Sequence, residues 1–146
     1  MVEQPYQDIH LFISARGLKD LEIIGVSDPI CLVHEQDPKK KTWAEVARTD
    51  IKKNDLNPDW GYVKMKYYFE KKQNLRFEIR DTDMDKPSKP MGYFEVTMGK
   101  IMGSKAQMIE VLLKDAGNNT AGLVLRAVTM DEAIHEETAG APLVAP

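Results

Sequence analysis

Short segments in which apolar and polar residues alternate recur along most of this chain, with Gly, Pro, Asn and Asp between them. In residues 9–14, Ile9, Leu11 and Ile13 each precede a residue that belongs to the opposite face. Such alternation places every second side chain on one face of an extended chain, which is typical of a strand with one buried face. Helical spacing of apolar residues is not sustained anywhere before residue 129. The sequence therefore predicts an all-β fold.

The number and spacing of these segments are typical of a sandwich of two antiparallel sheets. Eight strands are expected, at residues 9–14, 30–33, 43–51, 62–69, 75–79, 91–98, 107–113 and 121–128. One helical turn is expected where Gly99 and Gly103 bound a short connector. We therefore predict an eight-stranded antiparallel Greek-key β-sandwich over residues 1–130. Residues 131–146, acidic at first and then rich in Ala and Pro, are expected to form a tail beyond it.

Composition excludes several classes of protein. The 146 residues allow one domain with a proper core. With 20 Lys and Arg against 23 Asp and Glu, the net charge of -3 argues against a dedicated nucleic-acid binder. The one cysteine, Cys31, excludes a disulfide within the chain, and no zinc-type spacing of Cys and His occurs. Neither a secretory signal nor about 20 consecutive apolar residues are found, so a cytoplasmic location is expected.

Acidic residues gather in two loops between expected strands. They are Asp20, Glu22 and Asp28 before the second strand, and Asp81, Asp83 and Asp85 after the fifth. Loops of a sandwich gather at its two ends, so both groups meet if the strands before them run in the same direction. Facing carboxylates repel, and such a cluster is tolerated chiefly when a cation lies between them. Calcium, which takes about 6 to 8 oxygen ligands in flexible geometry, suits this arrangement.

Two other interpretations of these acids compete with a calcium site. Simple solvation explains any single loop aspartate, but it explains two paired clusters less well. Residues 81–85 also resemble the start of an EF-hand loop. That motif requires Gly at its sixth position and Glu at its twelfth, where this chain has Lys86 and Gly92, and its flanks are helices rather than strands. The EF-hand interpretation is therefore rejected.

Further segments point to one family. In order, the chain contains GLKDLEIIGVSDPICLV, ARTDIKKNDLNPDW, YYFEKKQNLRFEIRDTDMD, MGYFEV and AGLVLRAV. Together they resemble the C2 domain, a calcium- and phospholipid-binding β-sandwich, and most of all the first C2 domain of copines. The resemblance covers residues from about 8 to 130. It implies the type II strand order, in which the segment AGLVLRAV forms the last strand.

The resemblance also implies which residues hold calcium. Asp28, Asp81 and Asp83 match the family's ligand positions. Glu22 stands where the family usually has Asp, and Lys89 stands where it has another Asp, so a weaker site than a full set of five carboxylates is expected. The expected ligands of one or two calcium ions are Glu22, Asp28, Asp81, Asp83 and Asp85.

Two sets of residues are expected to reinforce contact with a membrane. Apolar side chains at the loop tips would each add roughly 1 to 3 kcal/mol on full insertion, unless they fold back onto the rim of the core; they are Leu21, Ile23, Ile24 and Met84. A basic surface would contribute about 1 kcal/mol per charge toward phosphoinositide headgroups, or would only keep the strands soluble; it comprises Lys52, Lys53, Lys64 and Lys66.

Taken together, the sequence predicts a non-catalytic module that binds anionic phospholipid membranes, chiefly phosphatidylserine, when calcium rises. Bound calcium would turn a pole that repels an anionic leaflet into one that attracts it. His10, His34 and His135 show no catalytic or metal-binding spacing. The alternative is a calcium-independent scaffold of the same fold, with a degenerate metal site, that binds a protein or lipid. Glu22 and Lys89 keep that alternative open, and no protein partner can be named.

Overall fold

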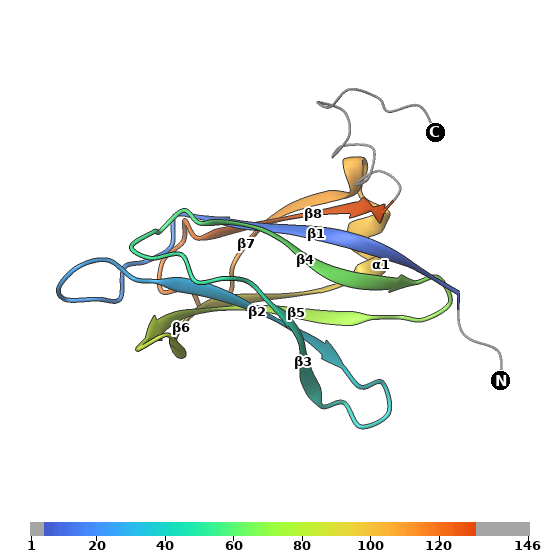
Figure 1. Cartoon of the computed structure of the whole chain (residues 1–146), viewed down its shortest axis with the longest axis horizontal. Coiled ribbons are helices and arrows are strands. Elements are labelled where there is room, and N and C mark those ends of the chain that lie inside the picture. The colour runs from blue at the N-terminus through green and yellow to red at the C-terminus, as the bar shows by residue number, and fades with distance from the viewer. Residues whose placement is uncertain (1–4, 131–146) are drawn as a thin grey trace, which may run out of the picture.

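The computed structural model describes residues 5–130, and the expected tail at residues 131–146 lies outside them. Two four-stranded sheets pack face to face (Figure 1). The first sheet has the order β4 (Asp59–Tyr68), β1 (Tyr6–Arg16), β8 (Gly122–Thr129) and β7 (Met108–Leu112). The second has the order β3 (Trp43–Arg48), β2 (Pro29–Gln36), β5 (Asn74–Asp83) and β6 (Lys86–Thr97). Every pairing between these strands is antiparallel.

The eight predicted strands and the sandwich are confirmed, and the type II strand order stays a prediction. The expected helical turn is also present, as α1 (Met98–Met102), followed by a short 3-10 turn, η1 (Lys105–Gln107). Alternation identified the inward faces correctly, since Ile9, Leu11 and Ile13 of β1 are completely buried. The same holds for Phe77 and its neighbours of the same face on β5, so these two strands each contribute every second side chain to one core between the sheets.

Two strand limits differ from those expected. β3 ends at Arg48 rather than near residue 51, because Thr49 turns its hydroxyl inward and residues 49–58 form a loop. β6 begins at Lys86 rather than at residue 91, because the β5–β6 connection is a two-residue hairpin turn. Its central residues, Met84 and Asp85, have φ values of 51° and 64°. Positive φ at both positions matches the twist of the flanking strands, but it is uncommon for residues other than Gly, Asn and Asp.

Thr49 joins β2 to the loop that leaves β3. Its Oγ1 accepts a hydrogen bond from the Cys31 backbone N–H at 3.0 Å and donates one to the Asp50 carbonyl at 2.9 Å. Thr49→Val removes the hydroxyl but keeps the shape, which leaves a buried N–H without its acceptor. We expect the free energy of unfolding to fall by about 1–2 kcal/mol in urea titrations. The exposed Thr42 is the control, and an unchanged urea midpoint for Thr49→Val would contradict this role.

Candidate metal and membrane site at one pole

Three connecting segments meet at one pole of the sandwich: the β1–β2 loop, the β3–β4 loop and the β5–β6 turn (Figure 1). The Asp28 backbone N–H donates to Oδ1 of Asp81 at 2.9 Å. The Asn54 backbone N–H donates to Oδ1 of Asp28 at 2.7 Å. The acidic segments before β2 and at the end of β5 are therefore neighbours, as the sequence led us to expect, and the β3–β4 loop joins them.

Asp81 lies at the centre of this pole. Its side chain is only 1% exposed, and its Oδ2 has no hydrogen-bond partner among the residues that the structure describes. The next residue, Thr82, fixes the backbone around it, since both its N–H and its hydroxyl donate to the Asp28 carbonyl, at 3.1 and 2.9 Å. A buried carboxylate oxygen without a donor is costly and calls for an explanation. A bound cation is one that satisfies the oxygen directly.

Glu22 approaches Asp81 from the β1–β2 loop. Its pKa is raised, first because a protonated Glu22 carboxyl can hydrogen-bond to the Asp81 side chain and then because of the negative charge of Asp81. Lys89 opposes this effect, because its Nζ lies 3.9 Å from Oε2 of Glu22. Two carboxylates this close repel each other, and a proton or a cation between them relieves the repulsion. The Glu22 carboxyl group therefore lies beside that of Asp81, and its role as a calcium ligand stays a prediction.

Asp20 holds the base of the β1–β2 loop instead of joining the acidic pair. Its Oδ1 accepts from the backbone N–H groups of Glu22 and Ser27, at 3.1 and 3.0 Å, and from the Ser27 hydroxyl at 3.3 Å. The Ser27 hydroxyl oxygen in turn accepts from the Leu21 N–H at 2.9 Å. Leu21 packs against the core. The loop is thus pinned at its base, and Leu21 differs from the other residues expected to insert into a membrane.

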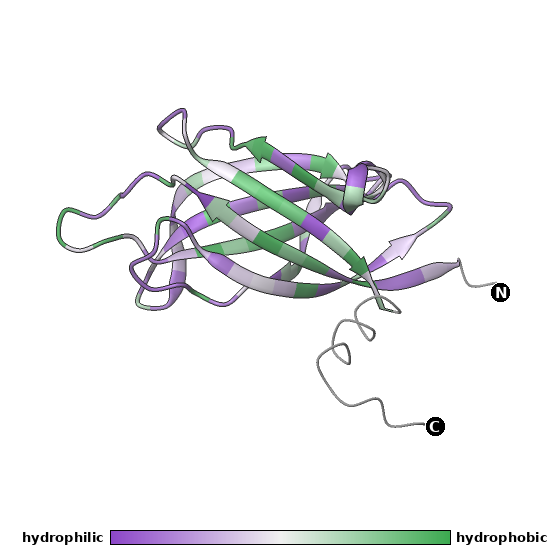
Figure 2. Ribbon diagram, turned by 90° about the horizontal axis from the view of Figure 1, so that it is seen from above, coloured by the Kyte–Doolittle hydropathy of each residue, from purple (hydrophilic) through white to green (hydrophobic). Residues whose placement is uncertain are grey.

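The tips of the two acidic segments carry apolar side chains that meet no core. Ile23 and Ile24 are 101% and 92% exposed, and Met84 is 89% exposed. Figure 2 shows the hydrophobic tip of the long loop that projects beyond the end of the sandwich. Single exposed apolar residues are ordinary on protein surfaces, whereas several at adjoining loop tips indicate a contact surface.

Asp83 and Asp85, at the other tip, are exposed. Asp85 forms an ion pair with Lys53, whose Nζ lies 2.7 Å from its Oδ1. This hydrogen bond, together with the charges of Asp85 and Asp28, raises the pKa of Lys53. No group of three or more His, Cys, Asp or Glu side chains within residues 5–130 is gathered closely enough to hold a metal ion. The carboxylate oxygens at the pole are hard ligands of the kind that calcium binds. Within residues 5–130, however, these carboxylates lie in pairs and not in groups of three or more.

The four lysines predicted to form one basic surface are divided between two places. Lys52 and Lys53 belong to the β3–β4 loop at the acidic pole, where the Lys52 backbone N–H donates to the Pro29 carbonyl at 3.0 Å and the Lys53 side chain pairs with Asp85. Lys64 and Lys66 line a groove of about 530 Å³, whose lining also includes the acidic residues Asp8 and Glu35. The Nζ of Lys66 lies 4.3 Å from the centre of the Tyr6 ring.

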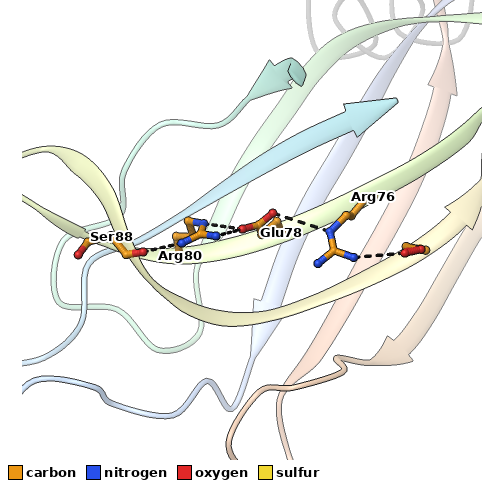
Figure 3. Close-up of polar contacts among 5 residues, drawn as sticks. Arg76, Glu78, Arg80 and Ser88 are labelled. Carbon is orange, nitrogen blue, oxygen red and sulfur yellow. Dashed lines mark hydrogen bonds and ion pairs between the residues drawn. The ribbon is translucent and has the colours of Figure 1, made fainter. Parts of the chain in front are cut away.

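A row of charged residues on the outer face of β5 supports the pole, and the sequence analysis missed it. Arg80 pairs with Glu78, Glu78 with Arg76 at 3.8 Å, and Arg76 with Glu95 at 3.2 Å (Figure 3). Arg80 also donates from Nη1 to the Ser88 carbonyl at 2.6 Å, which fixes the start of β6. The signal was present in the sequence, as Arg, Glu and Arg at every second position between the buried residues of this strand.

None of the helical segments between residues 5 and 130 has the length and apolar character that a transmembrane span requires. A family model for the C2 domain matches residues 10–113. Nicotinic receptor-associated protein 1 of Caenorhabditis briggsae is 31% identical over 156 residues, which cover 85% of this chain and 25% of that protein. The protein of the same name from Caenorhabditis elegans is 38% identical over 96 residues, which cover 55% of this chain and 15% of that protein. The chain therefore spans about a quarter of these relatives or less.

Solved structures show the same fold. A single C2 domain of plant extended synaptotagmin 1 is similar with a TM-score of 0.64 and 19% identity, covering 88% of this chain and 98% of that one. The calcium-bound pair of C2 domains from extended synaptotagmin 2 is similar with a TM-score of 0.62 and 20% identity. The match covers 88% of this chain and 47% of that one. Human GIVD cytosolic phospholipase A2 is similar with a TM-score of 0.63 and 13% identity. The match covers 88% of this chain but only 17% of that one. At these identities, the likeness concerns the fold.

Proposed function

Because this chain belongs to the C2 domain family, we propose that it binds anionic phospholipid membranes peripherally and in a calcium-dependent manner. In this proposal the module has no catalytic activity of its own, and it moves from the cytoplasm to phosphatidylserine-containing membranes when calcium rises. We further infer that it corresponds to the first C2 domain of copines, on the segments that carry that resemblance. The Caenorhabditis relatives are named for association with a nicotinic receptor.

The observation that carries this proposal is the buried Oδ2 of Asp81, which has no hydrogen-bond partner within residues 5–130 and lies next to the carboxyl of Glu22. Asp81, Glu22 and Asp28 would hold calcium, and the exposed Asp83 and Asp85 would complete the ligand set for one or two ions. Bound calcium supplies positive charge and free coordination positions that accept oxygens from lipid phosphate. Since the carboxylates stand as pairs in the structure, we expect small movements of the loops to accompany binding.

Once the acidic charge is neutralised, the loop tips can approach an anionic surface. Ile23, Ile24 and Met84 project from the same pole and would enter the headgroup layer. Leu21 would remain at the base of its loop, against the core. Charge neutralisation and apolar insertion would therefore act together, because neither strongly charged loops nor an uncharged tip alone gives firm attachment.

A calcium-independent scaffold is the second candidate, and the ion pairs of Lys53 with Asp85 and of Lys89 with Glu22 favour it. In that case the groove lined by Lys64 and Lys66 would contact lipid headgroups or a protein. The acidic residues of that groove, Asp8 and Glu35, oppose a highly charged phosphoinositide. We therefore place calcium-dependent binding first.

Co-sedimentation with vesicles separates the two candidates. The described domain would be mixed with phosphatidylserine-containing vesicles or with pure phosphatidylcholine vesicles, in calcium or in chelator. We expect strong binding only with phosphatidylserine and calcium together. Equal binding in chelator would contradict the proposal. If binding in chelator is equal and is then lost in the double variant Lys64→Ala, Lys66→Ala, the scaffold candidate is established instead.

A further inference from the structure

Two lysines lie directly among the acidic side chains of the pole. The Nζ of Lys53 is 2.7 Å from Oδ1 of Asp85, and the Nζ of Lys89 is 3.9 Å from Oε2 of Glu22. Lys53 comes from the β3–β4 loop, whereas Lys89 comes from the start of β6. Each acidic segment therefore carries an ammonium group from another part of the chain.

The backbone holds both lysines at the pole. Lys53 is followed by Asn54, whose N–H donates to the Asp28 carboxylate at 2.7 Å. Lys89 follows Ser88, whose carbonyl accepts from Arg80 at 2.6 Å in the row of charges on β5 (Figure 3). The two ammonium groups are thus kept near the carboxylates by contacts that do not involve the lysine side chains themselves.

Both ion pairs are easily opened. The side chains of Lys53 and Lys89 are 60% and 58% exposed, so each ammonium group can leave its partner for water at little cost. Exposed pairs of this kind contribute about 0–1 kcal/mol. A divalent cation that occupies the same carboxylates repels the ammonium groups and outcompetes them through its greater charge. Both lysines then remain at the pole, each without its carboxylate partner.

We propose that Lys53 and Lys89 are built-in counter-ions of the acidic loops, which calcium displaces and which then contact phosphate groups of anionic lipid. This inference rests on the proposed calcium-dependent function. It gives the same two side chains opposite effects on two equilibria. They weaken calcium binding in the absence of lipid, and they strengthen attachment to the membrane once calcium is bound.

The test uses Lys53→Met and Lys89→Met, because methionine keeps much of the apolar stem and removes the charge. Calorimetric titration of calcium without lipid should show each variant binding roughly three- to tenfold more tightly than the unmodified chain. At saturating calcium, each variant should bind phosphatidylserine vesicles about fivefold more weakly. Lys40→Met, in the turn at the other end of β2, makes the same change in net charge and should alter neither value.

The outcomes separate this inference from the function beneath it. If the unmodified chain shows neither calcium heat nor calcium-dependent sedimentation, both the function and the inference fail. If it responds to calcium, but the two variants bind calcium no more tightly than Lys40→Met, the counter-ion role alone is overturned. If calcium affinity rises while vesicle affinity at saturating calcium stays unchanged, the contact with lipid phosphate is overturned.

Discussion

Asp81→Asn is expected to abolish calcium-dependent sedimentation with phosphatidylserine vesicles while the sandwich stays folded. Asparagine keeps an oxygen that can accept the Asp28 N–H, so the bond between the two acidic segments survives. What is lost is the negative charge of a buried carboxylate whose Oδ2 has no protein partner among the described residues. Removing one of the few charged ligands of a calcium site should weaken calcium binding by about a hundredfold or more, roughly 3 kcal/mol.

The stability of the calcium-free domain gives this prediction a second readout. Because Asp81 lies beside Glu22, losing its charge relieves repulsion. We therefore expect the melting temperature in chelator to be unchanged or higher. Asp37→Asn, in the turn between β2 and β3, is the matched control and should leave calcium binding unaffected. A variant that still sediments fully with calcium, or that unfolds readily in chelator, would show that Asp81 has a structural role instead.

The second large effect is expected from Ile23→Asn combined with Ile24→Asn. These side chains are fully exposed, so the double variant should unfold at the same urea concentration as the unmodified domain. Its affinity for phosphatidylserine vesicles at saturating calcium should fall by about thirtyfold or more, since two inserted side chains are worth at least roughly 2 kcal/mol. Calcium binding without lipid should stay as it was, because neither side chain reaches the carboxylates.

Two controls show whether position or hydrophobicity matters. Met108→Asn removes an exposed apolar side chain from the start of β7, at the end of that strand away from the pole, and should not change vesicle binding. Leu21→Asn should lower the free energy of unfolding, because Leu21 packs against the core. If the double variant of Ile23 and Ile24 bound vesicles as tightly as the unmodified domain, apolar insertion would be excluded and attachment would be electrostatic alone.

Alternation of side chains was enough to predict most of the fold. The inward positions of β1 and β5 follow directly from it, because a half-buried strand buries every second residue. It could not predict where β6 begins, since residues 86–90 contain two prolines and two lysines and read as a loop. Pairing with the well-buried β5 extends that strand. Local propensity is overridden here by tertiary pairing.

At the candidate site, the sequence indicated which acidic segments come together, but not how individual side chains of the loops pack or pair. Asp28 and Asp81 were expected to be neighbours, and one hydrogen bond joins them. The sequence could not separate Leu21 from Ile23, because both are apolar residues of the same loop and only the packing of that loop buries one of them. Nor could it indicate that Lys53 faces Asp85, since the two are 32 residues apart and meet through the fold.

The most direct test follows backbone amide signals by nuclear magnetic resonance while calcium is added to the domain without lipid. Three amides report on the pole, since those of Asp28 and Asn54 donate to its carboxylates and that of Thr82 to the Asp28 carbonyl. The account predicts saturable shifts of these signals, whereas the amides of Lys39 and Lys40 in the opposite turn stay in place. Unchanged positions of all three signals up to about 1 mM calcium, where weak calcium modules bind, would contradict it.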